Sequence, residues 1–180
     1  MPKKTIKHPA KPKRGVKLDI EEPGVLYGRY SSHNQKDISV EQQFEKGYEL
    51  AADAQITTAM EDYLEMICRL EEEEAGSVRI RALSQKLHVK PSSASKMVSN
   101  LREKGLVTAQ KYGEIHLTDS GRTFGRYLLY RHELLHQFLC FLNHSQNELE
   151  QVEKIEHFVD EKTVRSIQAF LDSLTRDGGT

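Results

Sequence analysis

Six side chains with metal-binding chemistry lie in three short segments of the sequence. They are Asp62, Glu65, His132, Glu153, Glu156 and His157. At 3.6 residues per turn, the first two share one face of a helix and the last three share one face of another helix. Carboxylates and imidazoles that converge without a thiolate make a hard, mostly oxygen site, which suits Mn²⁺ or Fe²⁺. The sequence therefore predicts a metal centre to which three helices contribute.

Each of these residues also has an ordinary structural explanation when it is taken alone. A lone Asp62-x-x-Glu65 pair is usually a solvated helix face, and His132 within an apolar helix is more often a core histidine. The stretch from Glu153 to His157 could be surface charge. The order and spacing of all three segments together favour the metal centre over these separate explanations.

Further reactive groups lie near the predicted ligands. His136 follows His132 by one helical turn, a spacing found in zinc sites, but we expect it to pack or to support a ligand from behind. Glu133 is close enough in sequence to add to the negative charge of the centre. The cysteines Cys68 and Cys140 lie far apart, give no disulfide framework, and are predicted to be buried apolar filler.

The length and composition limit the class of protein. With 180 residues, 37% of them hydrophobic and 29% charged, the chain can form one domain or two small domains that share a core. No apolar run approaches the ~18 residues of a membrane span, and the N-terminus lacks the apolar stretch of a signal peptide. We therefore expect a cytoplasmic protein without a membrane partner.

Charge is distributed unevenly along the chain. The net charge is −1, yet residues 78–111 carry eight basic side chains against the single acid Glu103. Acidic residues collect instead at positions 71–74 and 148–161. A basic block beside acidic ones is typical of a DNA-binding lobe that is attached to a metal-binding or dimerisation lobe.

The basic block has the pattern of a helix-turn-helix. Ile80, Leu83 and Leu87 put an apolar stripe on a short helix, and Pro91 suits the first position of the next helix. The second helix buries the positions i, i+3, i+4 and i+7 from Ala94, and its other face carries short hydroxyls and a cation that can approach base edges and phosphates. The residues predicted to contact DNA are Lys90, Pro91, Ser92, Ser93, Ser95, Lys96 and, in the turn of a following hairpin, Lys111.

The hairpin and several helices complete the predicted fold. Residues 106–109 and 114–118 are expected to form the two strands of a wing, after Gly105 ends the reading helix. Further helices are predicted over 57–73, 119–142, 147–158 and 161–174. The apolar stripe of the helix over 119–142 is wide for a chain of this size, so we expect part of it to face a partner subunit.

The N-terminal part has a different composition. Residues 1–37 are predicted to form a basic, disordered tail, because lysines and prolines are common and large apolar side chains are rare. Such a tail is either simply solvated or adds non-specific phosphate contacts. From Ser39, the start of a capping box, the pattern is helical up to Ala54. We therefore predict a DNA-binding domain over 38–118 and a helical metal-binding and dimerisation domain over 119–176.

Four segments of the chain match one family pattern. They are Thr58–Glu65 (TAMEDYLE), Lys90–Val98 (KPSSASKMV), Tyr130–Leu135 (YRHELL) and Val152–His157 (VEKIEH). These segments resemble the DtxR/MntR family of metal-dependent repressors, over about residues 57–174, with every ligand position of the manganese branch occupied in order. The resemblance implies a mainly α homodimer, in which a winged helix-turn-helix DNA-binding domain is followed by a helical dimerisation domain. It also implies a binuclear metal site between the two.

The resemblance also favours a particular metal. Iron-responsive relatives carry a methionine and a cysteine at the positions that match Asp62 and Glu153 here. Carboxylates at both positions remove the sulfur ligands that favour softer metals, and so favour Mn²⁺. The chain also ends before any SH3-like domain, as in the manganese branch. The residues before Thr57 depart from the family pattern, which does not explain them.

We therefore expect a manganese-dependent DNA-binding repressor of metal-uptake genes, and not an enzyme acting on a small organic substrate. Without metal, the clustered carboxylates repel one another; metal removes this repulsion and fixes the winged helices at the spacing of successive half-sites. A repressor of the same fold that responds to Fe²⁺ or Zn²⁺ stays open, because most sites bind zinc more tightly than manganese. A dinuclear metallohydrolase would use similar residues, but it would need a substrate cleft and a general acid or base that the sequence does not indicate.

Overall fold

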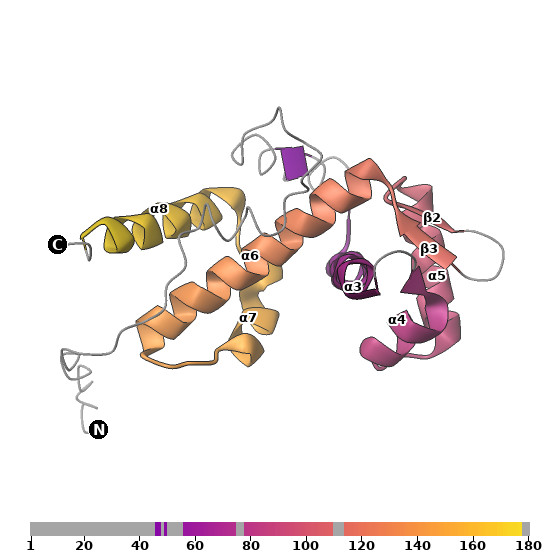
Figure 1. Cartoon of the computed structure of the whole chain (residues 1–180), viewed down its shortest axis with the longest axis horizontal. Coiled ribbons are helices and arrows are strands. Elements are labelled where there is room, and N and C mark those ends of the chain that lie inside the picture. The colour runs from indigo at the N-terminus through magenta and orange to yellow at the C-terminus, as the bar shows by residue number, and fades with distance from the viewer. Residues whose placement is uncertain (1–45, 48, 50–55, 75–77, 110–113, 178–180) are drawn as a thin grey trace, which may run out of the picture.

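The computed structural model describes residues 46–47, 49, 56–74, 78–109 and 114–177 (Figure 1). Three predictions fall outside these residues: the basic tail over 1–37, most of the helix predicted from Ser39, and Lys111 at the tip of the wing. The described part is mainly α, with a winged helix-turn-helix followed by a helical domain, which confirms the predicted fold class. No helix in this part of the chain is long and apolar enough to cross a membrane.

The described part consists of helices and three short strands. The helices are α3 (Thr58–Glu74), α4 (Ile80–Lys86), α5 (Pro91–Glu103), α6 (Asp119–Asn143), α7 (Leu149–Ile155), the 3-10 helix η1 (Glu156–Phe158) and α8 (Glu161–Asp177). The strands are β1 (Val78–Arg79), β2 (Val107–Ala109) and β3 (Glu114–Leu117).

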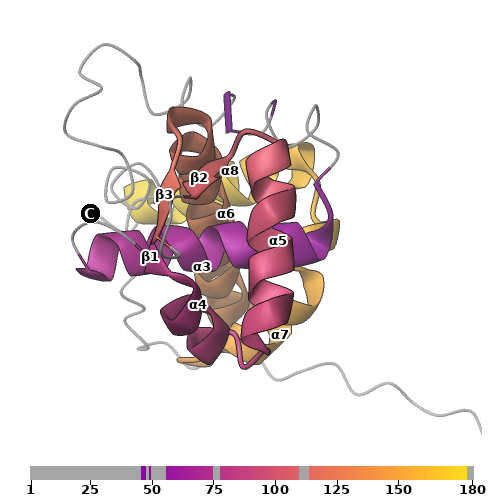
Figure 2. The ribbon, with the colours of Figure 1, turned by 90° about the vertical axis from the view of Figure 1, so that its right-hand side faces the viewer.

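Helix α3 lies at the centre of the fold and forms where the sequence predicts a helix over 57–73. Met60, Leu64 and Ile67 recur at helical spacing and are all buried, so the helix is held by one apolar face. Figure 2 shows α3 crossing between α5 and α6, and it packs against both. This helix therefore connects the DNA-binding half of the molecule to the helical half.

The helix-turn-helix forms as predicted. The chain turns from α4 through His88, whose φ of 54° is left-handed, and α5 begins with Pro91, where the missing N–H costs nothing. Ala94, Val98 and Leu101 are the buried residues of α5. Because these three lie on one side, the opposite side of the reading helix is left towards solvent.

The wing also forms, and it is one strand larger than predicted. β2 and β3 pair antiparallel, with Val107 opposite Leu117. The additional strand β1 pairs with β3, with Val78 opposite Ile115, so the sheet order is β1-β3-β2. A strand of two residues is too short to show the alternation by which a strand is predicted.

The start of α6 is fixed by a side-chain cap and by a close contact. Thr118 Oγ1 accepts a hydrogen bond from the backbone N of Gly121 at 3.0 Å. A Cβ at Gly121 would lie 1.8 Å from the carbonyl oxygen of Leu106, so only glycine fits there. Glu71 of α3 forms an ion pair with Arg122 of α6. These contacts join α6 to both the wing and α3.

The chain after α6 differs from the prediction. The sequence predicts one helix over 147–158, whereas the structure has α7 followed by the 3-10 helix η1. Ile155 has a φ of −119° and a ψ of −22°, which departs from α-helical geometry, so the prediction of a single continuous helix is wrong. Glu156, four residues after the buried Val152, is buried, while Glu153 is exposed.

Helix α8 packs along α6 through aromatic side chains. The ring of Phe170 packs edge-on against Phe138, with ring centroids 6.1 Å apart, and lies 5.7 Å from the ring of Phe141. Phe170 is nevertheless 41% exposed, and Leu142 at the end of α6 is 57% exposed. An apolar surface thus remains at this end of α6, where the sequence predicts contact with a partner subunit.

Candidate metal centre

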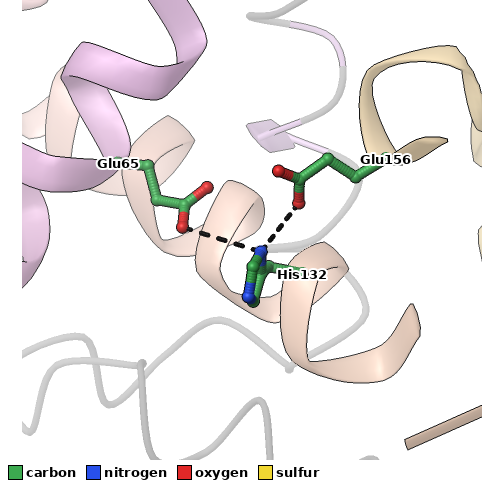
Figure 3. Close-up of side chains that lie close together, drawn as sticks. All are labelled: Glu65, His132 and Glu156. Carbon is green, nitrogen blue, oxygen red and sulfur yellow. Dashed lines mark hydrogen bonds and ion pairs between the residues drawn. The ribbon is translucent and has the colours of Figure 1, made fainter. Parts of the chain in front are cut away.

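Three of the predicted ligands come from three elements and converge in the interior (Figure 3). Glu65 lies on α3, His132 on α6 and Glu156 on η1, and one ligand-capable atom of each lies within 4.8 Å of the other two. His132 Nδ1 is 2.9 Å from Glu156 Oε2 and 4.0 Å from Glu65 Oε1. All three residues are buried. Their oxygen and nitrogen atoms are close enough together to bind one ion.

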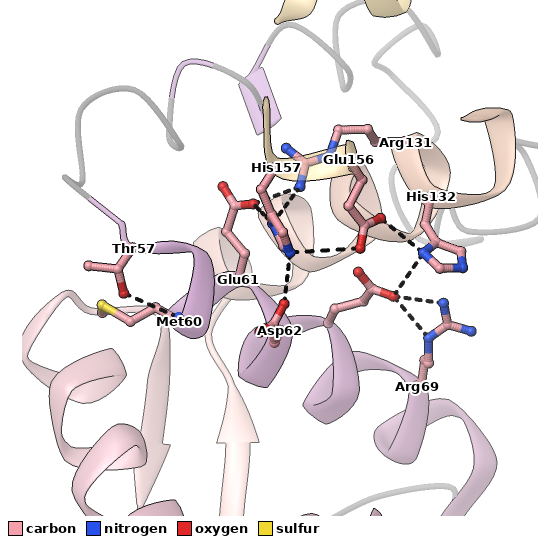
Figure 4. Close-up of polar contacts among 10 residues, drawn as sticks. Thr57, Met60, Glu61, Asp62, Arg69, Arg131, His132, Glu156 and His157 are labelled. Carbon is pink, nitrogen blue, oxygen red and sulfur yellow. Dashed lines mark hydrogen bonds and ion pairs between the residues drawn. The ribbon is translucent and has the colours of Figure 1, made fainter. Parts of the chain in front are cut away.

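Asp62, Glu156 and His157 form a second trio beside the first (Figure 4). His157 Nε2 lies 2.9 Å from Asp62 Oδ1 and 3.8 Å from Glu156 Oε1. Glu156 therefore directs one oxygen towards His132 and the other towards His157. A carboxylate in this position is able to bridge two ions.

Glu153, the sixth predicted ligand, lines a cleft at the same place. The cleft has a volume of about 480 Å³, and Asp62, Glu65, His132 and Glu156 line it as well. Although Glu153 as a whole is exposed, partial burial and the nearby charge of Glu156 raise the pKa of its carboxyl group. The structure thus places five of the six predicted residues around one cleft, and the sixth, His157, lies 2.9 Å from Asp62 at its side.

The two histidines supply positive charge to this acidic cluster. Hydrogen bonds to Asp62 and to Glu61 raise the pKa of His157 to about 10. Burial alone would lower the pKa of His132, but its hydrogen bond to Glu156 and the charge of Glu65 outweigh burial and raise it. A protonated His157 therefore lets the carboxylates share one space without a metal ion, so carboxylate repulsion alone does not describe the metal-free cluster.

A layer of charged residues that was not predicted from the sequence lies behind the predicted ligands. Glu61 Oε2 accepts a hydrogen bond from Arg131 Nη2 at 2.6 Å and lies 2.7 Å from His157 Nδ1. Burial would raise the pKa of Glu61, yet the hydrogen bond with His157 and the charge of Arg131 lower it. On the other side of the centre, Arg69 donates to Glu65 Oε1. Their position in the sequence could have indicated this layer, because Glu61 and Arg131 each directly precede a predicted ligand.

The other reactive groups named from the sequence lie elsewhere. His136 Nε2 is 3.5 Å from Cys140 Sγ, and Glu133 accepts a hydrogen bond from Gln137 at 3.4 Å. Neither His136 nor Glu133 is among the residues that line the cleft. Cys140 and Cys68 are both buried, as predicted, and burial raises the pKa of the Cys68 thiol to about 12.

The predicted DNA-contacting residues lie along one surface of the helix-turn-helix. They are Lys90 directly before α5 and, on α5 itself, Pro91, Ser92, Ser93, Ser95 and Lys96, all of them exposed. Figure 2 shows α5 at the front of the molecule with α3 behind it. Lys111 lies outside the described residues. The surface therefore offers hydroxyls and cations on a helix that can enter a groove.

The donor set fits a hard divalent cation. Four carboxylates and the imidazole of His132 line the cleft, the imidazole of His157 lies 3.8 Å from Glu156, and neither cysteine lines the cleft. Carboxylates suit Mn²⁺, and the imidazoles are also compatible with Fe²⁺ and Zn²⁺.

Two known family patterns match most of the described chain. Residues 55–115 match the family described as iron dependent repressor, N-terminal DNA binding domain. Residues 118–179 match the family described as iron dependent repressor, metal binding and dimerisation domain. The helix-turn-helix and most of the wing fall in the first match, and His132, Glu153, Glu156 and His157 fall in the second.

Individual relatives agree with these matches. The chain is 43% identical over 102 residues to the HTH-type transcriptional regulator MntR of Geobacillus kaustophilus, covering 56% of this chain and 72% of the relative. It is 38% identical over 112 residues to the HTH-type transcriptional regulator MntR of Bacillus subtilis, covering 62% and 78%. The crystal structure of a hypothetical protein from Sulfolobus solfataricus shares the fold, with a TM-score of 0.51 at 21% identity over 66% of this chain and 91% of the other. The chain belongs to the DtxR/MntR family of metal-dependent, DNA-binding transcriptional regulators.

Proposed function

We propose that the protein is a manganese-dependent repressor that acts as a homodimer in the cytoplasm and controls genes of metal-ion uptake. The observation that carries the proposal is the donor set: oxygen and nitrogen atoms from three elements meet around one cleft that neither cysteine lines. The names of its relatives, HTH-type transcriptional regulator MntR, point to the same class.

We assign the metal to six residues. They are Asp62, Glu65, His132, Glu153, Glu156 and His157. Because Glu156 has one oxygen towards each histidine, we infer a binuclear centre in which this carboxylate is shared. Bound metal supplies concentrated positive charge, which replaces the protons on the two imidazoles. The resulting contacts join α3, which carries Asp62 and Glu65, to α6 and η1.

Joining these elements is the means by which metal would control DNA binding. Helix α3 packs against α5, so fixing α3 relative to α6 also fixes the reading helix relative to the dimerisation half. In a dimer this sets the distance between the two reading helices, which must match successive turns of the major groove. Operator DNA would tighten metal binding by the same factor, since the coupling of two binding sites is reciprocal.

DNA contacts would come from the exposed surface of α5 and from the wing. Lys96 and the serines at 92, 93 and 95 can reach base edges or phosphates, while Lys90 and Lys111 add phosphate contacts on either side. Pro91 fixes the start of the helix that presents them.

The test is a titration of DNA binding against Mn²⁺, Fe²⁺ and Zn²⁺ under anaerobic conditions. The duplex is one that the full-length protein enriches from a random pool in the presence of Mn²⁺, and binding is followed by fluorescence anisotropy. We expect Mn²⁺ to switch binding on, Glu65→Gln to abolish the response, and the control Glu150→Gln, an exposed residue of α7 paired with Lys154, to leave it unchanged. A response to Fe²⁺ or Zn²⁺ but not to Mn²⁺ would support the other metals, and metal-independent binding would contradict the proposal.

A further inference from the structure

The guanidinium group of Arg69 forms hydrogen bonds with Glu65, one of the proposed metal ligands. Arg69 Nη2 lies 2.7 Å from Glu65 Oε1, and Nε lies 3.1 Å from the same oxygen. That oxygen is also the one nearest to His132, at 4.0 Å from Nδ1. Figure 4 shows Arg69 on the same side of the cluster as His132. Arg69 therefore holds the atom through which Glu65 would reach an ion.

Two donors on one carboxylate oxygen leave it little capacity for a further bond. A carboxylate oxygen has about two lone-pair positions, and Arg69 uses both at Oε1. An ion that binds this oxygen must displace at least one of these hydrogen bonds. The carboxylate can also turn to offer its other oxygen, but the cation of Arg69 then stays beside a divalent ion, and the two positive charges repel each other.

The position of Arg69 lets it leave the site. It lies on α3 one turn after Glu65, its side chain is 38% exposed, and it lines the cleft. Lys86 lines the same cleft, but its Nζ lies 3.4 Å from Glu73, which is not a predicted ligand. Arg131, by contrast, is buried and bonded to Glu61. Arg131 also lies 3.4 Å from His157, but among these three cations Arg69 alone is paired with the carboxylate of a predicted ligand.

Resting on the proposed function, we propose that Arg69 is a built-in competitor of the metal at Glu65. In the metal-free protein it stabilises the negative charge of Glu65, and on metal binding it moves towards the open edge of the cleft. Its competition weakens the affinity of the centre. Arg69 thus sets the Mn²⁺ concentration at which the protein binds its operator.

The test compares the Mn²⁺ dissociation constants of full-length variants in the absence of DNA, by electron paramagnetic resonance of free Mn²⁺ at low ionic strength. Arg69→Gln removes the charge, Arg69→Lys keeps it, and Lys86→Gln removes the other cation of the cleft without touching a ligand. We expect Arg69→Gln to bind Mn²⁺ between about threefold and tenfold more tightly, as for one partly screened charge. Arg69→Lys and Lys86→Gln should stay within about twofold of the unchanged protein.

Metal-free and metal-saturated melting temperatures give a second readout. Arg69→Gln should lower the melting temperature of the metal-free protein, because Glu65 loses its partner, and should not lower that of the Mn²⁺-saturated protein. Weaker Mn²⁺ binding by Arg69→Gln would overturn competition and make Arg69 a residue that orients Glu65. If Lys86→Gln tightened Mn²⁺ binding as much as Arg69→Gln does, competition at Glu65 would be overturned, and general charge repulsion in the cleft would explain the effect. A chain with native Arg69 that binds no Mn²⁺ would overturn both this inference and the proposed function.

Discussion

The two sides of the metal centre are held by different kinds of contact. On one side His157 lies against Glu61, which is also bonded to the buried guanidinium of Arg131, so these elements are joined without metal. On the other side Glu65 and Glu153 face the cleft, and the cation beside them is the partly exposed Arg69. The first side is therefore preformed by buried ion pairs. On the second side the positive charge comes only from the partly exposed Arg69, and a bound ion would replace it.

The largest expected effect is on the preformed side. Arg131→Met leaves Glu61 largely buried without its guanidinium partner, so the free energy of unfolding of the metal-free protein should fall by about 3 kcal/mol. Arg69→Met, which breaks a partly exposed pair, should cost less than about 1 kcal/mol. Urea unfolding of both variants at one protein concentration measures the difference. Equal losses would mean that the two sides are not held differently.

A double variant checks the cause of that loss. Glu61→Gln combined with Arg131→Met removes the stranded charge as well as its partner, so it should recover part of the stability that the single change loses. No recovery would place the effect in packing around Arg131 and not in its pairing with Glu61.

Glu156 belongs to both sides, and its replacement should affect both ions. Glu156→Gln keeps the shape of the side chain but removes the charge between His132 and His157. We expect Mn²⁺ affinity to fall by more than the ~10- to 100-fold that follows loss of a residue behind the ligands. Isothermal titration should show two weakened sites per chain, with Glu150→Gln as the unaffected control. Loss of one ion with the other unchanged would mean that Glu156 is not shared.

The stability of the metal-free protein and its affinity for Mn²⁺ should change in opposite directions with pH. Hydrogen bonds to Asp62 and Glu61 raise the pKa of His157 to about 10 in the metal-free protein, above the usual value of 6.5. Its charge therefore stabilises the metal-free fold fully below pH about 6.5, and this contribution is lost as the pH rises towards 10. Metal binding must displace the proton, so Mn²⁺ affinity should rise about tenfold per pH unit over pH 6.5 to 8.5 for each proton released.

Unfolding of the metal-free protein and Mn²⁺ titrations at pH 6.5, 7.5 and 8.5, both under anaerobic conditions, measure the two trends. Because the pKa of His132 is raised as well, up to two protons can be released. A Mn²⁺ affinity that does not change with pH would contradict the protonated pairs that the geometry indicates.

The helices could be predicted where a long apolar face defines them. The helices over 57–73 and 119–142 were placed within about one residue of α3 and α6, because each buries a stripe that repeats over several turns. The change from α7 to η1 was not predicted. Val152 and Ile155 fit an apolar stripe in a continuous helix equally well, so local sequence does not distinguish the two.

The candidate ligands could be named from the sequence, but their supports could not. Glu61 and Arg131 are 70 positions apart, and each alone resembles an ordinary surface charge on a helix. Only the crossing of α3 over α6 brings them together and buries them. The same holds for Arg69, whose spacing of four residues from Glu65 is that of a common surface pair and gives no sign of the cleft beside it.

The smallest expected loss of Mn²⁺ affinity follows a change at Glu153, on the side of the centre that faces the cleft. This change should mainly affect which metal the protein prefers. Glu153→Cys replaces a carboxylate at the edge of the cleft by a thiolate, which is a softer ligand. Because Glu153 is one of the two exposed residues among the six, Mn²⁺ affinity should fall only on the order of tenfold. Affinity for Co²⁺ and Zn²⁺ should rise, and operator binding should respond to them at lower concentrations than to Mn²⁺.

Absorption spectra of the Co²⁺-loaded variant show whether the new sulfur is a ligand, since a Co²⁺–thiolate bond gives a charge-transfer band that carboxylates lack. Glu150→Cys is the matched control, one turn earlier on α7, where its side chain pairs with Lys154 in solvent. It should give neither the band nor a change in metal preference. If Glu153→Cys behaves like Glu150→Cys, Glu153 does not bind the metal, and the open side of the centre is completed by another donor. If Glu153→Cys lowers Mn²⁺ affinity as much as Glu156→Gln does, the side of the centre that faces the cleft contributes as much to metal binding as the preformed side.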